Sequence, residues 1–340
     1  MQRALSTFAV AARVARRFEK ARLMDDTDIL SIARRILGQP TAPFHEDAVR
    51  REIRALLADC AHIALSEDRF GNLLAHYRLG KSPARFAFAA HMDHPAYVGR
   101  EFLGGVPERY LKMKPRTRKF GAFRMWDLPE CEVRSGRIRS RACDDLIGCT
   151  AIVAALRELE NSGAKCSAWG LFTRAEEVGF VGAIELAKSA RLPKSVTIVS
   201  LETSSVKGGP VKIGGGPIIR VGDRTSVFDS AATAQLQAAA KCAGITHQRA
   251  LMQGGTCEAS AYALYGYRTA AMCVALGNYH NCGPGDCIAP EYVSIADTLG
   301  MARLCAAAAT GATADPHRDL RANLEKRLAD HRRFFRRLVK

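Results

Sequence analysis

Five residues of the metal-ligand type are spread over the middle and C-terminal half of the 340-residue chain. They are two histidines and three carboxylates: His91, Asp144, Glu177, Glu202 and His280. A mixed nitrogen and oxygen set of this kind suits zinc, cobalt or manganese. Asp93 and Glu176 lie beside proposed ligands, where a hydrolase needs an orienting group and a proton acceptor. The sequence therefore predicts a metal-dependent hydrolase.

His91 and Asp93 are two residues apart at the end of an apolar run that is typical of a strand. Because alternate side chains of a strand point to the same face, Asp93 can accept a hydrogen bond from the ring nitrogen of His91 that is not on the metal. An H-x-D pair alone is a weak indicator, since it is more often structural. We expect His94, which points the other way, to lie behind the ligands or to face solvent.

Asp144 and Asp145 come directly before a helical pattern. Aspartate is favoured at helix N-termini, so an ordinary capping role explains one of the pair. We expect Asp145 to cap the helix and Asp144 to face the site. A carboxylate has two oxygens and can bridge two cations, whereas a neutral imidazole cannot, so we assign the bridging role to Asp144.

Glu176 and Glu177 follow a strand-like run and have apolar neighbours. Adjacent acids in such surroundings are costly unless they are paired or bound to metal. One glutamate as a ligand and the other as the general base on a water would make a chemically complete arrangement.

The elements that would position these residues alternate along the chain. Strand patterns occur at 84–92, 167–173, 196–201 and 269–276. Helical patterns occur at 27–36, 45–60, 146–160, 181–190 and 227–243. The alternation predicts an α/β fold with a largely parallel sheet between helices. Glu202 and His280 then follow buried strands at the carboxyl edge of that sheet, where such folds bind ligands.

Composition shifts divide the chain into parts. We expect a discontinuous catalytic domain at 1–94 and 141–313, a short basic inserted β subdomain at 95–140, and a basic C-terminal helix at 314–340. The first twenty residues are expected to form an amphipathic helix that packs on the body. The C-terminal helix has an apolar stripe, and docking on the body or on another subunit is favoured over membrane binding.

The net charge of +16 is concentrated outside the proposed site. Lys and Arg outnumber acids by six to one in residues 1–22, by eleven to five in 95–140, and by nine to four in 314–340. A nucleic-acid enzyme would more often line its site with such charge, so basic solvated faces are the preferred interpretation.

Cysteine usage and hydropathy bear on location. Eleven cysteines, an odd number, are scattered through apparent core segments with no secretion signal before them. This favours reduced thiols and a cytoplasmic protein over a disulfide framework. No apolar run is long enough to span a bilayer, so no membrane partner is expected.

The ordered motifs H-M-D, D-D-x-x-G, E-E-V-G-F-x-G-A, G-G-T and Y-H resemble those of the glutamyl and tetrahedral aminopeptidases, which belong to the wider group of co-catalytic zinc exopeptidases. The resemblance covers roughly residues 25–310. It implies a mixed sheet between helices with a small β domain inserted after the H-x-D strand, which is the position of residues 95–140.

The resemblance also implies roles for each residue of the site. Asp144 would bridge two metal ions, for which zinc is preferred to cobalt or manganese. His91 and Glu202 would complete one ion, and Glu177 and His280 the other. Glu176 would be the general base, and Asp93 the partner of His91.

The chain departs from the family at several positions. Glu202 and Leu146 stand where the family usually has Asp and Arg, and Cys257 replaces the Asp of its G-T-D motif. The inserted segment is about half the usual size, and in the family it helps to build tetrahedral dodecamers. A homo-oligomer is still expected, but its architecture and the substrate preference stay open.

Three functions follow in order of preference. The first is an aminopeptidase that removes N-terminal residues from peptides with a two-metal-activated water and a glutamate base. The second is a related deacylase or amidohydrolase that acts on N-acyl amino acids or dipeptides. The third is a non-catalytic metal-binding protein whose basic segments engage an acidic partner.

Overall fold

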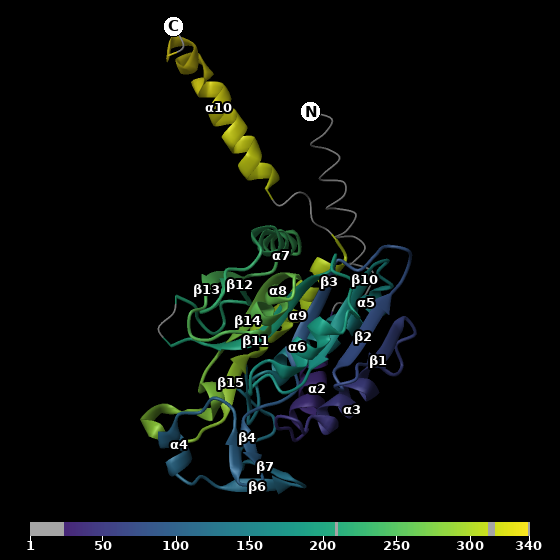
Figure 1. Cartoon of the computed structure of the whole chain (residues 1–340), viewed down its shortest axis with the longest axis vertical. Helices are drawn as coiled ribbons and strands as arrows, with labels where there is room; N and C mark the ends of the chain where they lie inside the picture. Colours follow the sequence, from purple (N-terminus) through teal and green to yellow (C-terminus); the bar gives the residue numbers. More distant parts are fainter. Residues whose placement is uncertain (1–23, 208–209, 312–316, 339–340) are drawn as a thin grey trace.

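The computed structural model describes residues 24–207, 210–311 and 317–338. A central sheet lies between layers of helices, two smaller sheets lie at one end of the body, and a C-terminal helix extends from the other end (Figure 1). The amphipathic helix predicted for the first twenty residues falls outside the described residues.

The central sheet has eight strands in the order β1-β2-β10-β3-β11-β14-β12-β13. Their bounds are β1 Ile63–Glu67, β2 Leu73–Arg78, β3 Phe86–His91, β10 Ser167–Thr173, β11 Thr197–Ser205, β12 Ile218–Gly222, β13 Gln248–Leu251 and β14 Arg268–Leu276. The four central strands β10, β3, β11 and β14 are parallel to one another. β1 and β2 pair antiparallel at one side, and β12 pairs antiparallel with β14 at the other. The sheet is therefore mixed with a parallel centre, which confirms the predicted fold class.

Helices cover both faces of this sheet, which explains why the central strands are apolar on both sides. Those on one face are α2 Asp26–Leu37, α3 Asp47–Leu57, α5 Leu146–Ser162, α7 Ser230–Cys242 and α9 Ile295–Ala309. Those on the other are α6 Val181–Lys188 and α8 Glu258–Leu264. Leu171 and Ile198 of the sheet pack with Leu186 and Tyr262 on the second face.

The expected helices and strands appear close to their predicted bounds, and the structure adds to them α8, α9 and the strands β1, β2, β12 and β13. The sequence of α9, IADTLGMARLCAAAA, is buried over most of its length. Because small and apolar residues lie on nearly every side of α9, the periodic pattern that marks α2 and α3 is missing from it.

Two small sheets form the end of the body that lies opposite the C-terminal helix (Figure 1). The first has the order β5-β4-β7-β6, with β4 Ala96–Val98, β5 Glu101–Leu103, β6 Thr117–Phe120 and β7 Phe123–Trp126, and α4 Glu108–Lys112 lies between β5 and β6. The second has the order β15-β9-β8, with β8 Glu132–Arg134, β9 Arg137–Ser140 and β15 Glu291–Ser294. A strand from near the end of the fold thus pairs with residues that directly precede Asp144.

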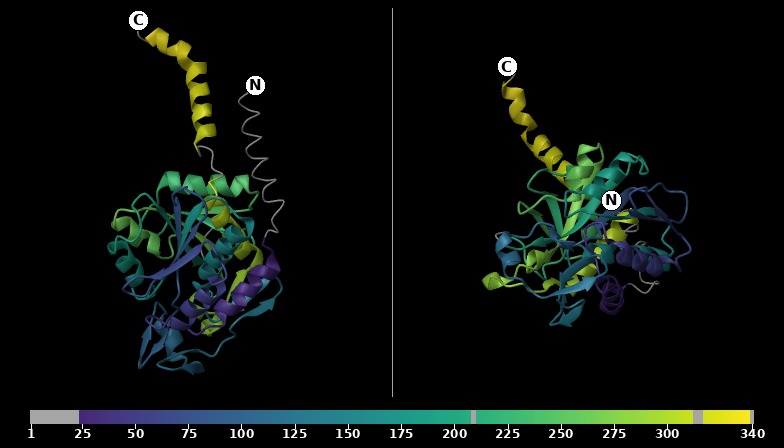
Figure 2. Two further views of the ribbon diagram at one scale, coloured as in Figure 1. Left: turned by 90° about the vertical axis from the view of Figure 1, so that its right-hand side faces the viewer. Right: turned by 60° about the horizontal axis from the view of Figure 1, so that its bottom comes forward.

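The last helix, α10 Arg318–Leu338, extends away from the body in each view (Figures 1 and 2). The side chains from 320 to 334 are exposed. Within the described ranges, no helix is long and apolar enough to cross a membrane. All eleven cysteines lie in the described ranges, and all are free thiols.

Candidate metal centre

The predicted ligands meet at the carboxyl edge of the parallel strands. His91 is the last residue of β3, and Glu202 lies in the second half of β11. Glu177 and His280 follow β10 and β14 by a few residues. Asp144 precedes α5, where Asp145 accepts a hydrogen bond from the amide of Gly148 and caps the helix as expected. Four strands or strand ends and one helix start therefore converge on one point.

Among the described residues, the side chains form three overlapping groups of potential ligands. Two of these triads share the Asp144 carboxylate: the ligand atoms of His91, Asp144 and Glu202 lie within 4.8 Å of one another, and so do those of Asp144, Glu177 and His280. The third group brings Glu176 within the same distance of His91 and Glu177. Asp144 Oδ1 lies 3.7 Å from His91 Nε2, whereas its Oδ2 lies 3.4 Å from His280 Nε2. The Asp144 carboxylate thus presents one oxygen to each histidine, as a bridging ligand does.

This set of residues fits cations of the divalent kind. Asp144 Oδ1 and Glu177 Oε1 are buried and have no hydrogen-bond partner among the described residues. Buried carboxylate oxygens without a partner are costly unless they bind a donor or a metal ion. Two imidazoles with three carboxylates match the preferences of zinc and of similar transition metals.

The pKa shifts of the carboxyl groups in the metal-free site also indicate that positive charge would stabilise it. Burial, with help from the neighbouring Asp144, raises the pKa of Glu202 to about 8, although His91 opposes the shift. Burial also raises the pKa of Glu176 well above its usual value, and Glu202, Glu177 and Asp93 add to it against His91. Burial would raise the pKa of Asp144 too, but the neighbouring His280 and His91 outweigh it and lower that pKa.

Both histidine rings are oriented by backbone carbonyl groups. His91 Nδ1 lies 3.1 Å from the carbonyl oxygen of Asp93, and His280 Nδ1 lies 2.9 Å from that of Gly105. Because a carbonyl oxygen only accepts, each Nδ1 carries a proton, so Nε2 is the ring atom that would offer a lone pair to a cation. Both Nε2 atoms face the carboxylates at the centre of the site.

Asp93 is buried and holds the backbone of Glu176 and Glu177 in place. Its Oδ1 accepts from the amide of Glu176 at 3.0 Å, and its Oδ2 accepts from the amide of Glu177 at 3.1 Å. The same carboxylate lies 3.4 Å from His91 Nδ1, slightly farther than the carbonyl oxygen of Asp93. One side chain thus sets the relative positions of the proposed base and one proposed ligand.

Glu291 is an organising residue that the sequence did not reveal. It is fully buried, and its Oε2 accepts from the amides of Cys143 at 2.7 Å and Asp144 at 3.0 Å. Its Oε1 accepts from the amide of His280 at 2.8 Å. Burial raises the pKa of Glu291 to about 7. A glutamate within the short strand β15 was the signal, but nothing in the sequence says which segments it would tie together.

His94 supports Asp144 from behind. It is buried, so the first of its two expected placements is confirmed and the solvent-facing one is wrong. Its Nδ1 lies 2.6 Å from the carbonyl oxygen of Asp144, and its Nε2 lies 3.1 Å from Asn281 Oδ1. The strand that carries His91 has ended by this point, so the alternation that predicted its direction no longer decides whether it meets solvent.

Cys257, at the position of the missing aspartate, is buried at the N-terminus of α8. Its amide donates to Asp223 Oδ2 at 3.0 Å, and the Ser260 hydroxyl donates to the same oxygen at 2.7 Å. Burial raises the pKa of the Cys257 thiol, so it stays protonated beside the site. Asp223 therefore supplies the anion that holds the start of α8.

Comparison with known proteins shows which protein family this chain resembles. The model of the M42 glutamyl aminopeptidase family matches residues 118–283, a range that holds four of the five proposed ligands and Glu176. The chain is related to the M42 glutamyl aminopeptidases. It is thus a peptide hydrolase of the aminopeptidase class, and the resemblance seen in the motifs is confirmed.

Similar proteins agree with this relationship. A curated protein of Acetivibrio thermocellus, provisionally named as an aminopeptidase, is 23% identical over 286 residues, which is 68% of this chain and 85% of that one. The structure of an aminopeptidase from the archaeon Desulfurococcus kamchatkensis matches with a TM-score of 0.71 at 19% identity, over 86% of this chain and 96% of that one. The TET1 peptidase of Pyrococcus horikoshii, which can assemble into a tetrahedron or a large octahedral shell, matches with a TM-score of 0.68 at 20% identity, over 83% of this chain and 99% of that one.

Proposed function

We propose that this M42 relative is a metallo-aminopeptidase that uses two divalent ions to hydrolyse the first peptide bond of its substrates. The observation that carries the proposal is the pair of triads that share Asp144. A single structural metal would need neither a shared carboxylate nor a fifth ligand, because structural sites are usually closed by four.

The chain offers a distinct set of ligands to each ion. His91 and Glu202 would complete one site, Glu177 and His280 the other, and Asp144 would serve both. Zinc is the preferred metal, with cobalt or manganese as alternatives. When bound, two such ions would supply Lewis-acid activation of a water and would stabilise the negative charge that develops on the carbonyl oxygen.

Glu176 is the proposed general base. Its side chain is 11% exposed, and one of its carboxylate oxygens lies 3.9 Å from His91 Nε2, at the edge of the ligand cluster. Its raised pKa suits a group that accepts a proton from water and later donates it to the leaving amine near neutral pH. The hydrogen bonds from the amides of Glu176 and Glu177 to Asp93 would keep the base in line with the site.

The remaining parts of the proposal concern assembly and location. We propose a homo-oligomer, supported by the assembly named for the TET1 peptidase, and a cytoplasmic location, supported by the free thiols. The division into a catalytic domain at 1–94 and 141–313, an inserted β subdomain at 95–140 and a helix at 314–340 stays a prediction.

Metal content and peptide hydrolysis test this function together. We expect elemental analysis to find near two metal ions per chain, and we expect the protein to hydrolyse aminoacyl anilides in a way that a chelator abolishes and added metal restores. Metal without cleavage of any anilide would refute the aminopeptidase assignment, and protein purified with no metal and unable to bind any would refute the site.

The deacylase remains the second candidate because of Cys257. Where the family has a carboxylate beside the site, this chain has a buried neutral thiol, so one anionic group that could attract a free amino terminus is missing. Turnover of N-acyl amino acids in preference to matched free dipeptides would favour this candidate, and the reverse preference would exclude it.

A further inference from the structure

The helix α10 carries an exposed apolar stripe on a strongly basic background. Leu320, Leu324 and Leu328 are four residues apart and are 58%, 54% and 49% exposed, and Phe334 is 48% exposed. Side chains at this spacing lie on one side of a helix. The 21 residues of α10 hold eight Lys or Arg and three acids, a net charge of +5. An apolar stripe among basic side chains is complementary to an apolar surface that carries acidic groups.

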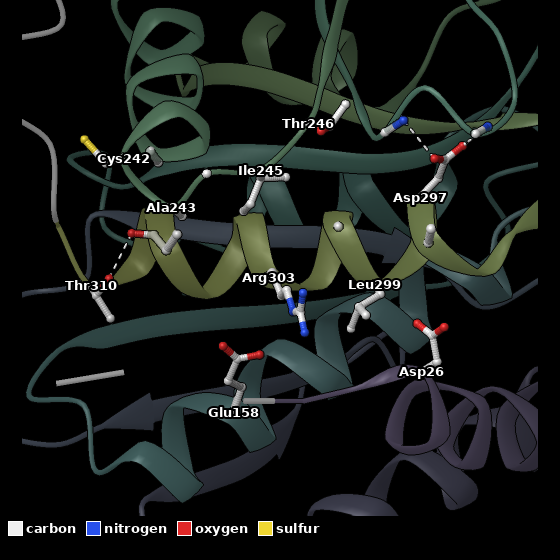
Figure 3. A pocket seen from close by; sticks show the side chains of 17 residues that line it. Asp26, Glu158, Cys242, Ala243, Ile245, Thr246, Asp297, Leu299, Arg303 and Thr310 are labelled. Atoms are coloured by element: carbon white, nitrogen blue, oxygen red, sulfur yellow. Dashed lines mark hydrogen bonds between the residues drawn. The ribbon is translucent and has the colours of Figure 1, made fainter. Parts of the chain in front are cut away.

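A groove with these properties runs along α9. It has a volume of about 530 Å³ and lies between α7 on one side and the start of α2 and the end of α5 on the other (Figure 3). Leu299, Ala307, Ile245 and the backbone of Gly300 give it an apolar floor. Small residues along α9 leave room for large side chains from another helix, as helix-in-groove docking requires.

The charged groups of the groove are mostly acidic. Among the described residues, Asp26, Glu158 and Asp297 line it together with one cation, Arg303, which gives this lining a net charge of −2. Glu158 is 6% exposed, and its Oε2 has no hydrogen-bond partner among the described residues. Figure 3 shows Glu158 and Arg303 facing each other, while Arg303 also donates to the carbonyl oxygen of Met24. The net negative charge of this lining is complementary to the net positive charge of α10.

We propose that the groove over α9 binds the apolar stripe of α10 from a second copy of this chain. The helix projects from its own body, so its stripe is presented to a neighbouring molecule (Figures 1 and 2). Thr310, at the end of α9, lines the groove, and α10 begins at Arg318, so each copy carries the helix and the groove at the same end. A reciprocal exchange of helices about a two-fold axis therefore closes on itself.

The TET1 peptidase structure is matched over 99% of its own length but over only 83% of this chain, so that fold is complete without about a sixth of this chain. The described residues that line the groove over α9 include none of the proposed ligands and not the proposed base. Docking by α10 would therefore leave the candidate metal centre uncovered.

Two native cysteines allow a direct test. Cys242 lines the groove and is exposed, while Cys287 is exposed on the turn near His280 and serves as the internal reference. We expect alkylation of Cys242, followed by mass spectrometry, to be at least tenfold slower in the full chain than in the double variant Leu324→Glu/Leu328→Glu, with Cys287 unchanged. The matched control is Ala329→Glu, which adds an acid on the opposite side of α10 and should behave as the full chain.

The mass in solution decides between a second copy and other occupants. By sedimentation equilibrium we expect the full chain at twice 37.0 kDa or a multiple of that value, and a fall of at least twofold in the double variant. A protected Cys242 in a monomer would mean that α10 occupies its own groove and would overturn the proposal. Exposure of Cys242 on deletion of residues 1–23, rather than in the α10 variant, would assign the groove to that segment instead.

Two further results would also overturn the proposal. A mass that falls in the double variant while Cys242 reacts equally fast in both proteins would place α10 on another surface. Co-sedimentation of the full chain with phosphatidylserine vesicles, lost in the double variant, with Cys242 reactive throughout, would make a lipid surface the partner. Neither readout depends on hydrolysis, so the outcome is independent of the proposed function.

Discussion

The candidate metal centre and α10 hold charged residues in opposite ways. At the centre, carboxylates are buried and oriented by backbone amides: Asp93 accepts from two amides and Glu291 from three. On α10, charges lie in solvent beside an equally exposed apolar stripe. The first arrangement is assembled within one chain and suits the proposed binding of cations, whereas the second suits the proposed contact with another copy. Buried charges with fixed geometry fit a role in chemistry, and an exposed apolar stripe fits a role in assembly.

The largest effect is expected when the proposed proton acceptor is removed from the candidate metal centre. We expect Glu176→Gln to lower kcat by about 10²–10⁴-fold, because the amide cannot take a proton from water, while bound metal stays near the native amount. Anilide hydrolysis and elemental analysis on the same sample measure both. Native turnover in this variant would remove Glu176 from its role, and Glu132→Gln, at an exposed glutamate on β8, is the matched control.

A smaller effect is expected from a residue that touches no proposed ion. In Glu291→Gln, one of the carboxylate oxygens that accept from Cys143, Asp144 and His280 becomes an NH₂ group that faces an N–H donor. We expect metal affinity to fall by about 10–100-fold, as is usual when groups that orient metal ligands are lost. Competition with a chromophoric chelator measures it. Unchanged affinity would show that the buried carboxylates do not depend on their backbone donors.

The smallest effect is a pH dependence of stability, which we expect from the candidate metal centre and not from α10. Burial raises the pKa of Glu202 to about 8 and those of Glu291 and Glu258 to about 7, whereas the unfolded chain titrates these groups near 4.5. The native metal-free protein therefore binds more protons across this window, and its free energy of unfolding falls as pH rises from about 4.5 to about 8. We expect the Tm of the metal-free protein to drop by roughly 5 °C between pH 5 and pH 8.

Two controls test whether the buried carboxylates cause this fall in Tm. Added metal should remove most of the drop, because cations replace the protons that the buried carboxylates otherwise need. Deletion of residues 318–340 should leave the slope unchanged, since exposed charges titrate alike in the folded and unfolded chain. A Tm of the metal-free protein that rises over the same range would contradict the assigned direction of these pKa shifts.

The parts of this molecule that follow local rules were predictable from the sequence. Strand ends at a parallel sheet edge brought His91, Glu202 and His280 together, because apolar runs fix strands and the carboxyl edge is where such folds carry function. The capping role of Asp145 likewise follows from its place directly before α5. The conclusion about metal binding rested on residue types whose chemistry does not depend on their distance along the chain.

Apart from Asp93 beside His91, the groups that orient the proposed ligands could not be predicted, because they come from distant segments. Glu291 reaches Asp144 across 147 positions of sequence, and Gly105 reaches His280 across 175. Neither contact leaves a periodic or compositional trace. The same holds for β15, which pairs with β9 and so joins a segment after His280 to one before Asp144. Long-range pairing of this kind is decided by the tertiary fold alone.

The hydrogen bond between His280 and Gly105 limits how far the segment between β3 and α5 can shrink. His280 receives its orientation from the backbone carbonyl group of Gly105 in that segment. Deletions can shorten the sheet formed by β4, β5, β6 and β7, but the segment after His91 must stay long enough for a backbone carbonyl group to reach His280. This one contact therefore sets the minimum length of the segment. Homologues whose segments differ in length should all keep a backbone carbonyl group close to the equivalent histidine.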